Sequence, residues 1–251
     1  MSFPKPTFFI PTLAVVLWVL YRFWRSKRRA RTTVTATVPQ TLAVPLDPTP
    51  DSPIQFGYKN SWLAIQAPTT EAVAEAAGIS DLRPANWRTG ILAASESGVF
   101  LTPPVSGWVL IVGYSLPDLD PDRRDDWESL LRPLAARFRQ VCYFGTQRVV
   151  GYNAWAKFAD GQLVRALAYV GERGEILVNE GTPTPEEITL NHKFSSLPPG
   201  PLEGSEDDYP PTPDEEDVLD MAAAWSVSTR ELPDLAPNPS SGWVSRKWPV
   251  A

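Results

Sequence analysis

Two side chains that often act as nucleophile or base occur once each in this chain. Cys142 is the only cysteine and His192 the only histidine among 251 residues. One cysteine excludes an internal disulfide and a multi-cysteine zinc or iron–sulfur site, and one histidine excludes a multi-histidine metal centre. His192 precedes a proline-rich segment, so we expect it in an exposed loop. Cys142 begins a predicted strand and is expected as a small buried side chain.

Motifs for covalent, phosphate or metal chemistry are incomplete. The stretch closest to G-x-S-x-G, residues 113–117, lacks the final glycine. Gly171 and Gly174 lie between predicted strands and indicate a turn instead of a phosphate cradle. Nine acidic residues fall between 203 and 220, without the spacing of a calcium loop. We expect a solvated acidic loop there, or a docking segment for a basic partner, and we expect no cofactor and no metal.

Arginine, tyrosine and glutamate side chains along a predicted β-meander remain as candidates for binding, and no catalytic residue is assigned. Arg165 has three possible roles: a buried ion pair with Glu180 or Glu172, a solvent-exposed position, or a site for an anionic ligand. Arg148, at the end of its strand, has the same ambiguity. The candidate set is Arg148, Tyr152, Arg165, Tyr169, Glu172 and Glu180.

The meander contains the clearest turn signal in the chain. Asp160-Gly161 between two strand-like runs predicts a type I′ hairpin with positive φ at Gly161. Its two-residue loop fixes a register in which Trp155 and Arg165 lie on opposite faces, both at least partly covered. The predicted pairs are Phe158–Leu163, Ala156–Arg165, Ala154–Leu167, Tyr152–Tyr169 and, on the other face, Trp155–Ala166.

The elements before the meander predict an α+β fold with helices packed on an antiparallel sheet. Apolar residues at helical spacing between 125 and 138 indicate an amphipathic helix. The predicted order is strand, helices, strand, strand, helix, strand, which is the ferredoxin-like βαββαβ order extended by the meander. The strands are expected at 61–66, 99–102, 107–114 and 141–147, and the helices at 71–77, 84–95 and 125–138.

Composition divides the chain into five segments, with its 27 prolines concentrated in the connecting ones. The proline-rich residues before position 59 are expected to form a stalk that holds the domain away from a membrane. The segments are an N-terminal transmembrane anchor (1–24), a basic juxtamembrane segment and stalk (25–58), an α+β domain (59–194), a proline-rich acidic loop (195–213), and a C-terminal helix with an irregular tail packed on the domain (214–251).

The N-terminal segment is uncharged from Phe8 to Tyr21 and predicts one membrane span, at the short end of the usual length. Basic residues beside a span stay in the cytoplasm, so we expect the inner membrane, with the N-terminus outside and the body cytoplasmic. A cleaved signal and an interfacial helix are the alternatives. The membrane-orienting residues are Arg25, Lys27, Arg28, Arg29 and Arg31.

Charge is distributed unevenly along the chain. Residues 1–46 hold seven of the 23 basic residues and no acid. The remaining 16 basic and 29 acidic residues give the part from residue 47 onward a formal charge of −13. Phosphate contacts require basic side chains, so this composition argues against a nucleic-acid partner.

Several short phrases resemble, as a set, a family of uncharacterised bacterial proteins that occurs in soluble and membrane-anchored versions. The resemblance covers roughly residues 56–228 and implies a bacterial origin and one fold, and the family has no assigned activity. The phrases are Gly107-Trp108, Tyr143-Phe144-Gly145-Thr146 with Arg148, Tyr152-x-x-Trp155, Val164-Arg165-Ala166, Tyr169-Val170-Gly171-Glu172, Asn179-Glu180-Gly181 and the later Ala222-Ala-Ala-Trp225-Ser226.

Two classes of function remain open on these grounds. The first is a membrane-tethered, cytoplasm-facing protein-interaction module without catalytic activity, such as an immunity-type or envelope-machine accessory protein. The second is a small enzyme that uses an Arg/Tyr/carboxylate cleft on an anionic small molecule. A deep pocket lined by several of the candidate residues favours the enzyme, and a flat acidic or aromatic face favours the module.

Overall fold

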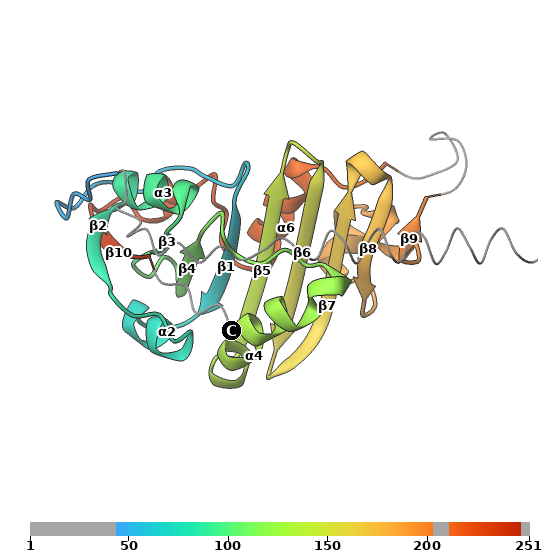
Figure 1. Ribbon diagram of the computed structural model, residues 1–251, viewed down its shortest axis with the longest axis horizontal. Coiled ribbons are helices and arrows are strands. Elements are labelled where there is room, and N and C mark those ends of the chain that lie inside the picture. The colour runs from blue at the N-terminus through green and yellow to red at the C-terminus, as the bar shows by residue number, and fades with distance from the viewer. Residues whose placement is uncertain (1–43, 203–210, 247–251) are drawn as a thin grey trace, which may run out of the picture. The chain divides into compact units, whose positions relative to one another are not determined.

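The computed structural model describes residues 44–202 and 211–246 (Figure 1). The expected membrane span, its five orienting basic residues and residues 203–210 of the acidic loop lie outside this part. Within it, no helix is long and apolar enough to cross a membrane.

The described part of the chain forms one ten-stranded sheet in which every neighbouring pair is antiparallel. The strand order is β2-β10-β3-β4-β1-β5-β6-β7-β8-β9. The predicted α+β class with an antiparallel sheet is therefore confirmed. The strands are β1 (Ser61–Gln66), β2 (Arg83–Asn86), β3 (Val99–Leu101), β4 (Trp108–Val112), β5 (Gln140–Gln147), β6 (Tyr152–Ala159), β7 (Gln162–Val170), β8 (Glu175–Glu180), β9 (Gly200–Pro201) and β10 (Ser241–Ser245).

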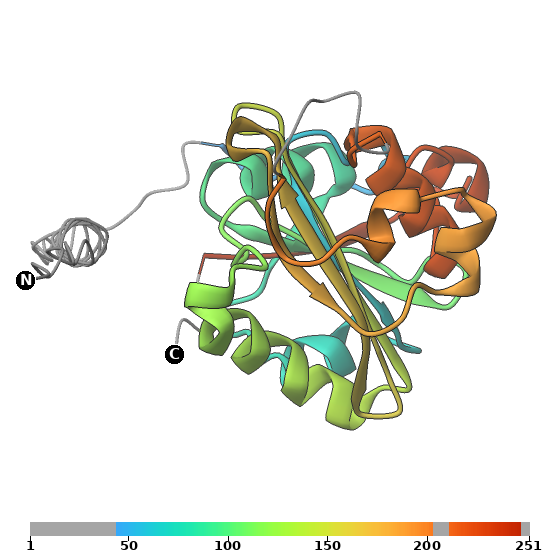
Figure 2. The same cartoon turned by 90° about the vertical axis from the view of Figure 1, so that its right-hand side faces the viewer.

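Helices cover both faces of the sheet (Figure 2). Side chains of α2 and α4 belong to one buried cluster, and side chains of α3 and α6 belong to a second cluster across the sheet. The helices are α2 (Thr70–Ala76), α3 (Trp87–Glu96), α4 (Arg124–Arg137), α5 (Pro185–Thr189), α6 (Glu215–Trp225) and α7 (Leu232–Leu235), with 3₁₀ turns η1 (Pro121–Arg123), η2 (Gly171–Arg173) and η3 (Lys193–Ser196).

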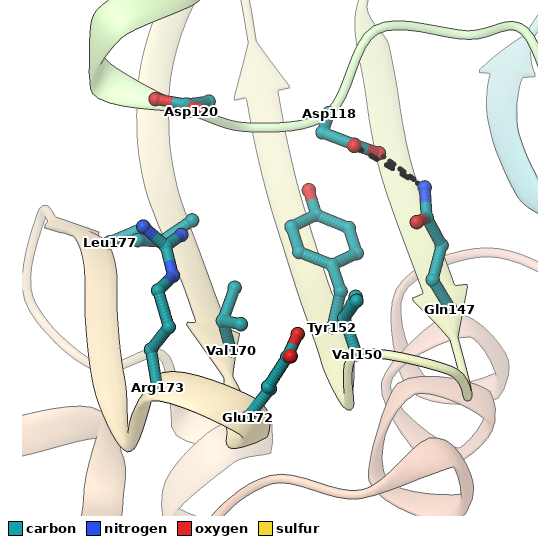
Figure 3. Close-up of a pocket in the computed structure, with 9 residues that line it drawn as sticks. All are labelled: Asp118, Asp120, Gln147, Val150, Tyr152, Val170, Glu172, Arg173 and Leu177. Carbon is teal, nitrogen blue, oxygen red and sulfur yellow. Dashed lines mark hydrogen bonds between the residues drawn. The ribbon is translucent and has the colours of Figure 1, made fainter. Parts of the chain in front are cut away.

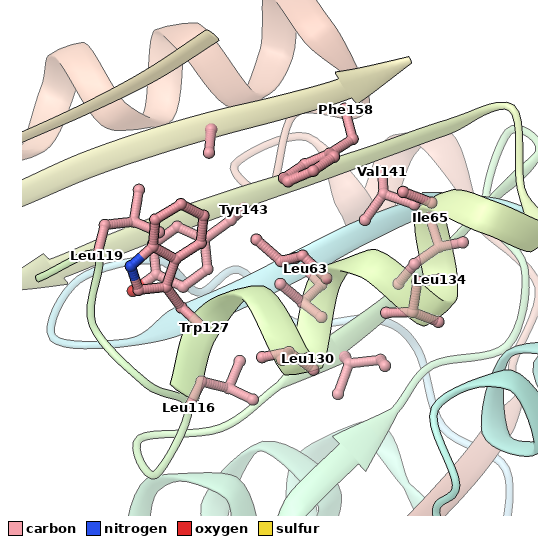
Figure 4. Packing of buried hydrophobic residues seen from close by; sticks show 14 of the residues in the cluster. Leu63, Ile65, Leu116, Leu119, Trp127, Leu130, Leu134, Val141, Tyr143 and Phe158 are labelled. Atoms are coloured by element: carbon pink, nitrogen blue, oxygen red, sulfur yellow. The ribbon is translucent and has the colours of Figure 1, made fainter. Parts of the chain in front are cut away.

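The amphipathic helix α4 forms as its spacing predicts. Trp127, Leu130 and Leu134 lie on one side of it and pack against Leu63 and Tyr143 of the sheet (Figure 4). Residues three and four apart share one face of a helix, so a single apolar stripe is enough to fix α4 on the sheet. The loop that enters α4 is held in the same cluster by its leucines, which positions the polar residues between them.

The β6–β7 hairpin confirms the predicted turn and corrects the predicted register. Asp160 and Gly161 have φ of 48° and 80°, as a type I′ turn requires. Phe158 pairs with Leu163 as expected, but the next pair is Lys157 with Arg165, because Val164 forms a β-bulge.

The bulge shifts every later pair by one residue. Trp155 therefore lies opposite Leu167, and Arg165 shares a face with Trp155, so the prediction of opposite faces is wrong. An extra residue in one strand is invisible in an alternating pattern of apolar residues, which explains the error. The other predicted pairs that it overturns are Ala156–Arg165, Ala154–Leu167, Tyr152–Tyr169 and Trp155–Ala166.

The part of the expected stalk that the structure describes, residues 44–58, packs along the domain. Val44 and Phe56 are buried, and the Asp51 carboxylate accepts the backbone N–H of Trp87 at 2.7 Å at the start of α3. The predicted helix over 84–95 begins later, at Trp87, where the Asn86 side chain caps its first turn. Backbone and side-chain caps from a distant segment, which propensity does not reveal, set this boundary.

Two segments expected to be irregular contribute strands. Residues 241–245 form β10, which pairs with β2 on one side and β3 on the other. Gly200 and Pro201, in the expected proline-rich loop, pair with β8 as β9. Both strands are too short to show a period of two, and they depend on distant partners for their hydrogen bonds.

Candidate functional site

The six candidate binding residues do not form one cleft. Tyr152 and Glu172 line one cavity, and Arg148 lines a different hollow. Arg165 is fully buried, Tyr169 is buried on the face opposite Tyr152, and Glu180 pairs with Arg124. The predicted binding residues therefore lie in five separate environments.

Arg165 forms a buried ion pair, as one of its three predicted roles required. Its Nε lies 2.9 Å from both Oε1 and Oε2 of Glu187, and both side chains are 0% exposed. Its other nitrogens donate to Asn179 Oδ1, to the Glu180 carbonyl at 2.9 Å and to the Ser195 carbonyl at 3.2 Å. The guanidinium is thus surrounded by acceptors and is unavailable to a ligand.

The expected partners Glu180 and Glu172 were wrong, because Glu187 occupies the position. Its carboxylate also accepts from Trp155 Nε1 at 3.0 Å, Ser195 Oγ at 3.2 Å and the Thr184 backbone N–H at 2.7 Å. The last bond belongs to the capping box of α5. A Thr-Pro-Glu-Glu pattern is typical of such a box, but nothing in it shows that its glutamate also faces the sheet. The result is a fully satisfied buried network that joins β6, β7, α5 and η3.

The side chains of Cys142 and His192 are both inside the domain. Burial raises the pKa of the Cys142 thiol to about 12, so the reactive thiolate is disfavoured. His192, which we expected in an exposed loop, packs between the rings of Trp155 and Phe194, with Nδ1 3.5 Å from Asp217 Oδ1. Neither residue is presented to a substrate.

A cavity of about 180 Å³ lies on the α4 side of the meander (Figure 3). The 117–120 loop forms its upper wall, Tyr152 of β6 stands in its centre, and η2 and β8 close the other side. The lining residues are Asp118, Asp120, Gln147, Val150, Tyr152, Val170, Glu172, Arg173 and Leu177. Two of the predicted binding residues, Tyr152 and Glu172, line it together.

Asp118 is the most unusual ionisable group of this cavity. Gln147 Nε2 donates to its two oxygens at 3.1 and 3.3 Å. Burial raises the pKa of the Asp118 carboxyl, and the charge of Arg123 and the Gln147 hydrogen bond offset only part of that effect. A carboxyl whose pKa is perturbed by burial inside a cavity is a recognised mark of a functional site.

Tyr152 fixes the loop that carries Asp118. Its Oη accepts the Leu119 backbone N–H at 2.7 Å and lies 3.4 Å from the Tyr143 Oη, which in turn is 3.3 Å from Ser61 Oγ. Burial raises the pKa of both phenols, so both stay protonated. The cavity therefore presents a neutral hydroxyl beside a carboxyl whose ionised form is disfavoured by burial.

Asp118 and Gln147 were not among the residues predicted from the sequence. The signal that could have found Asp118 is the run of aspartates at 118, 120 and 122 in the loop between an apolar strand and an amphipathic helix. Polar residues at such a loop are placed at the edge of the sheet by the flanking elements. Gln147 ends β5, and only the pairing of β5 with β6 brings it beside Tyr152.

A second, shallower hollow of about 270 Å³ surrounds Arg148 at the β5–β6 turn. Arg148 Nε lies 2.9 Å from Glu215 Oε2, and its guanidinium lies 5.6 Å from the Tyr58 ring centre. Tyr58 Oη donates to Glu216 Oε1 at 2.6 Å. The adjacent Val149 side chain is 91% exposed. This surface combines an aromatic ring, an arginine, an apolar tip and the acidic start of α6.

Among residues 44–202 and 211–246, no group of three or more His, Cys, Asp or Glu side chains is arranged to hold a metal ion. Comparison of the chain with models of protein families, with curated proteins and with solved structures gives no match. The assignment of a function therefore rests on the two surfaces just described.

Proposed function

We propose that this protein is a membrane-tethered, cytoplasm-facing interaction module without catalytic activity, which binds another protein. An immunity-type protein, or an accessory protein of an envelope machine, is an example of such a module. The apolar N-terminal stretch followed by basic residues supports a single span in the inner membrane, with the domain in the cytoplasm.

The observation that carries the proposal is the surface around Arg148. Tyrosine and arginine are enriched among the residues that dominate binding energy in protein interfaces. Here Tyr58, 42% exposed, and Arg148 lie against each other, and Val149 projects from the same turn. Because Val149 is almost fully exposed to water, its contacts give it no role in stabilising the fold.

Charge supports a basic partner. Glu215, Glu216, Asp217 and Asp220 follow one another along α6, and the only described cations that pair with the first, second and last of them are Arg148 and Arg230. The sequence adds four acids at 203–208. Complementary potential raises association rates and selects partners more than it raises affinity.

The enclosure of the reactive side chains also supports an interaction module over an enzyme. Cys142, His192 and the Arg165–Glu187 pair all serve the interior. The alternative, an enzyme for an anionic small molecule, needs a free arginine in its cleft. Arg148 and Arg165 lie away from the Asp118 cavity, and its one lining arginine, Arg173, pairs with Glu175. The carboxylates of that cavity repel an anion.

Capture of partners on the full chain tests the proposal. The tagged full-length protein, cross-linked in its host and purified in mild detergent, should retain a protein that Val149→Glu and Arg148→Glu both lose. Leu92→Glu, at another exposed apolar position, is the matched control and should retain it. Retention by all three variants, or no capture at all, would refute this surface as the binding site.

The orientation is tested separately. An alkaline-phosphatase fusion after Ala251 should be inactive in a bacterial host, because the enzyme is active only outside the cytoplasm. Neutral replacements of the five orienting residues should raise its activity. An active fusion on the unaltered chain would refute a cytoplasmic domain.

We also infer that the middle of the sheet is a ferredoxin-like unit. The support is the run β3-β4-β1-β5 in the sheet, in which each strand is antiparallel to its neighbours. The helices α2 and α4, which share one buried cluster, cover this run from one side.

A further inference from the structure

The Asp118 cavity is too small for a nucleotide or a large cofactor. Pockets for such ligands have volumes of about 300–1,000 Å³, whereas this cavity has about 180 Å³. A cavity of about 150 Å³ holds a benzene molecule. The space therefore fits a ligand with about six non-hydrogen atoms.

The charges at the cavity favour a cation. Among the described residues, the side-chain hydrogen bonds to the Asp118 carboxylate come only from the neutral amide of Gln147. Arg173, the one arginine in the lining, already lies 3.2 Å from Glu175 Oε2. Glu172, exposed at the opposite wall, adds a second carboxylate, and its oxygens point up toward Tyr152 in Figure 3.

The neighbouring charged groups do not supply that cation. Arg123, the closest basic influence on Asp118, has its Nε 2.7 Å from Asp126 Oδ2. Asp120 lies on the same loop, and its Oδ1 caps η1 by accepting the Asp122 backbone N–H at 2.8 Å. The half-buried Asp118 carboxylate thus has no direct ionic partner in the part of the chain that the structure describes.

Tyr152 offers an oxygen suited to the same ligand. It accepts one N–H, from Leu119, and keeps a second lone pair. The Tyr143 hydroxyl donates to Ser61 Oγ, so in its long 3.4 Å contact with Tyr143 the Tyr152 hydroxyl is the donor, and its second lone pair stays free. The rest of the lining is apolar, from Val150, Val170 and Leu177, which suits methylene groups.

We propose that this cavity binds the ammonium group of a primary alkylamine. Asp118 and Tyr152 accept two of the three ammonium N–H groups, Glu172 attracts the charge from the opposite wall, and the valines and Leu177 contact the alkyl chain. A charge-assisted bond to Asp118 supplies the ionic partner that residues 44–202 and 211–246 do not provide.

Such an ammonium group has two sources, a free small amine or the side chain of a lysine in a protein docked over the cavity. Both present the same chemistry to Asp118. The inference goes beyond the interaction surface at Arg148 and does not depend on it, since the two hollows have no lining residue in common.

Nuclear magnetic resonance on the full chain in mild detergent tests the site directly. n-Butylammonium chloride should cause saturable shifts of the Gln147 side-chain amide and the Leu119 backbone amide. The neutral isostere n-butanol should bind at least about tenfold more weakly, because it cannot form the charge-assisted bond.

Matched variants assign the effect to the carboxylates. Asp118→Asn should weaken n-butylammonium binding by about tenfold or more, whereas Asp125→Asn, an equal charge change on the adjacent α4, should leave it within about twofold. Glu172→Gln, at an exposed position that does not endanger folding, should weaken binding by about two- to fivefold. If Asp118→Asn fails to fold, Glu172→Gln decides, and an unchanged affinity in it overturns the proposal.

A blocked lysine, Nα-acetyl-lysine N-methylamide, separates the two sources. Binding of both compounds at Gln147 and Leu119 supports a lysine side chain as the occupant, and binding of n-butylammonium alone supports a free amine. Equal affinity for n-butanol and n-butylammonium, no saturable shift at these two amides, or full binding by a folded Asp118→Asn variant would overturn the ammonium site.

Discussion

Glu187 and Asp118 are carboxylates on opposite faces of the β6–β7 hairpin, and their surroundings differ sharply. Glu187 is fully buried and accepts from the Arg165 guanidinium, the Trp155 indole, the Ser195 hydroxyl and a backbone N–H. Asp118 is half-buried and accepts side-chain hydrogen bonds only from Gln147 in the described part of the chain. Four donor groups bind the Glu187 carboxylate, whereas one side-chain amide binds that of Asp118.

The difference separates a structural role from a binding role. A saturated carboxylate has no capacity for a ligand, and it fixes the four elements that supply its donors. An unsaturated one raises the free energy of the folded protein until a cation reaches it, which is the usual relation between a binding group and stability. The number of donors distinguishes the two roles.

The largest expected effect comes from breaking the Arg165–Glu187 ion pair. Arg165→Ala leaves the fully buried Glu187 without its cation, so the free energy of unfolding should fall by about 3–5 kcal/mol. Urea unfolding of the variant and the unaltered chain measures the change. A variant with an unchanged midpoint would show that Arg165 is not needed by the carboxylate.

A double replacement sharpens the same comparison. Arg165→Met with Glu187→Leu removes both charges, and replacing a buried pair by apolar residues often costs little. The double variant should therefore lose less stability than the sum of the two single variants, with a coupling of about 1–3 kcal/mol in a double-mutant cycle. Recovery should stay incomplete, because Trp155 Nε1 and the Thr184 N–H also lose their acceptor. Strict additivity would contradict a direct ion pair.

The backbone next to this pair gives an intermediate effect. Gly181 has φ of 79°, and a Cβ there would lie 2.1 Å from the carbonyl oxygen of the bulged Val164. Gly181→Ala must shift one of the two strands that surround Arg165, and should cost about 1–3 kcal/mol. Gly174→Ala, also at positive φ but with open space around it, is the control for the φ effect alone. If Gly181→Ala and Gly174→Ala lower the Tm equally, the Val164 bulge can move to accommodate the added Cβ.

Asp118→Asn should give the smallest change, with the opposite sign. The folded pKa of Asp118 is raised above its ordinary 3.8 by burial, so the folded state binds its proton more tightly than the unfolded state. Stability therefore falls as pH rises from 3.8 through the raised pKa, and Asn avoids that loss. Above this range the variant should have a slightly higher Tm, by less than the 2–4 °C that about 1 kcal/mol represents in a domain of this size.

The pH dependence supplies the control for that prediction. Below the ordinary aspartate pKa of 3.8 the carboxyl is neutral in both states. The difference in Tm between Asp118→Asn and the unaltered chain should then vanish. A difference that persists at low pH would point to altered packing and not to the charge.

Much of the sheet and α4 could be predicted from local patterns. The Asp160-Gly161 turn and the Trp127–Leu134 stripe depend on neighbours in sequence, and both formed as expected. The Val164 bulge, β10 and the packed 44–58 segment depend on partners far along the chain, which period and propensity do not show. Contacts with residues distant in the sequence fix each of these three features.

The binding residues were predictable only in part, for a related reason. Tyr152 and Glu172 were among the candidates because of residue type and their place on the meander. Asp118 and Gln147 become neighbours only when the loop before α4 is held against β6 by the Leu119–Tyr152 bond. Arg165 was correctly predicted as a candidate for a buried ion pair. Its partner Glu187 lies in α5, and the predicted strand register did not place that helix beside Arg165.

The position of β10 has a consequence for the synthesis of this protein. Among the described strands, β2 has no other neighbour than β10, and Ser241 pairs with Asn86, 155 residues earlier in the chain. A ribosome makes β2 long before its partner, so the strand emerges into the cell without a place in the sheet. A polypeptide whose translation stops before residue 241 would expose the edge of β3 to strands of other chains, a known route to aggregation. Proteases and chaperones that survey unpaired strands thus have a means to tell a finished molecule from a truncated one.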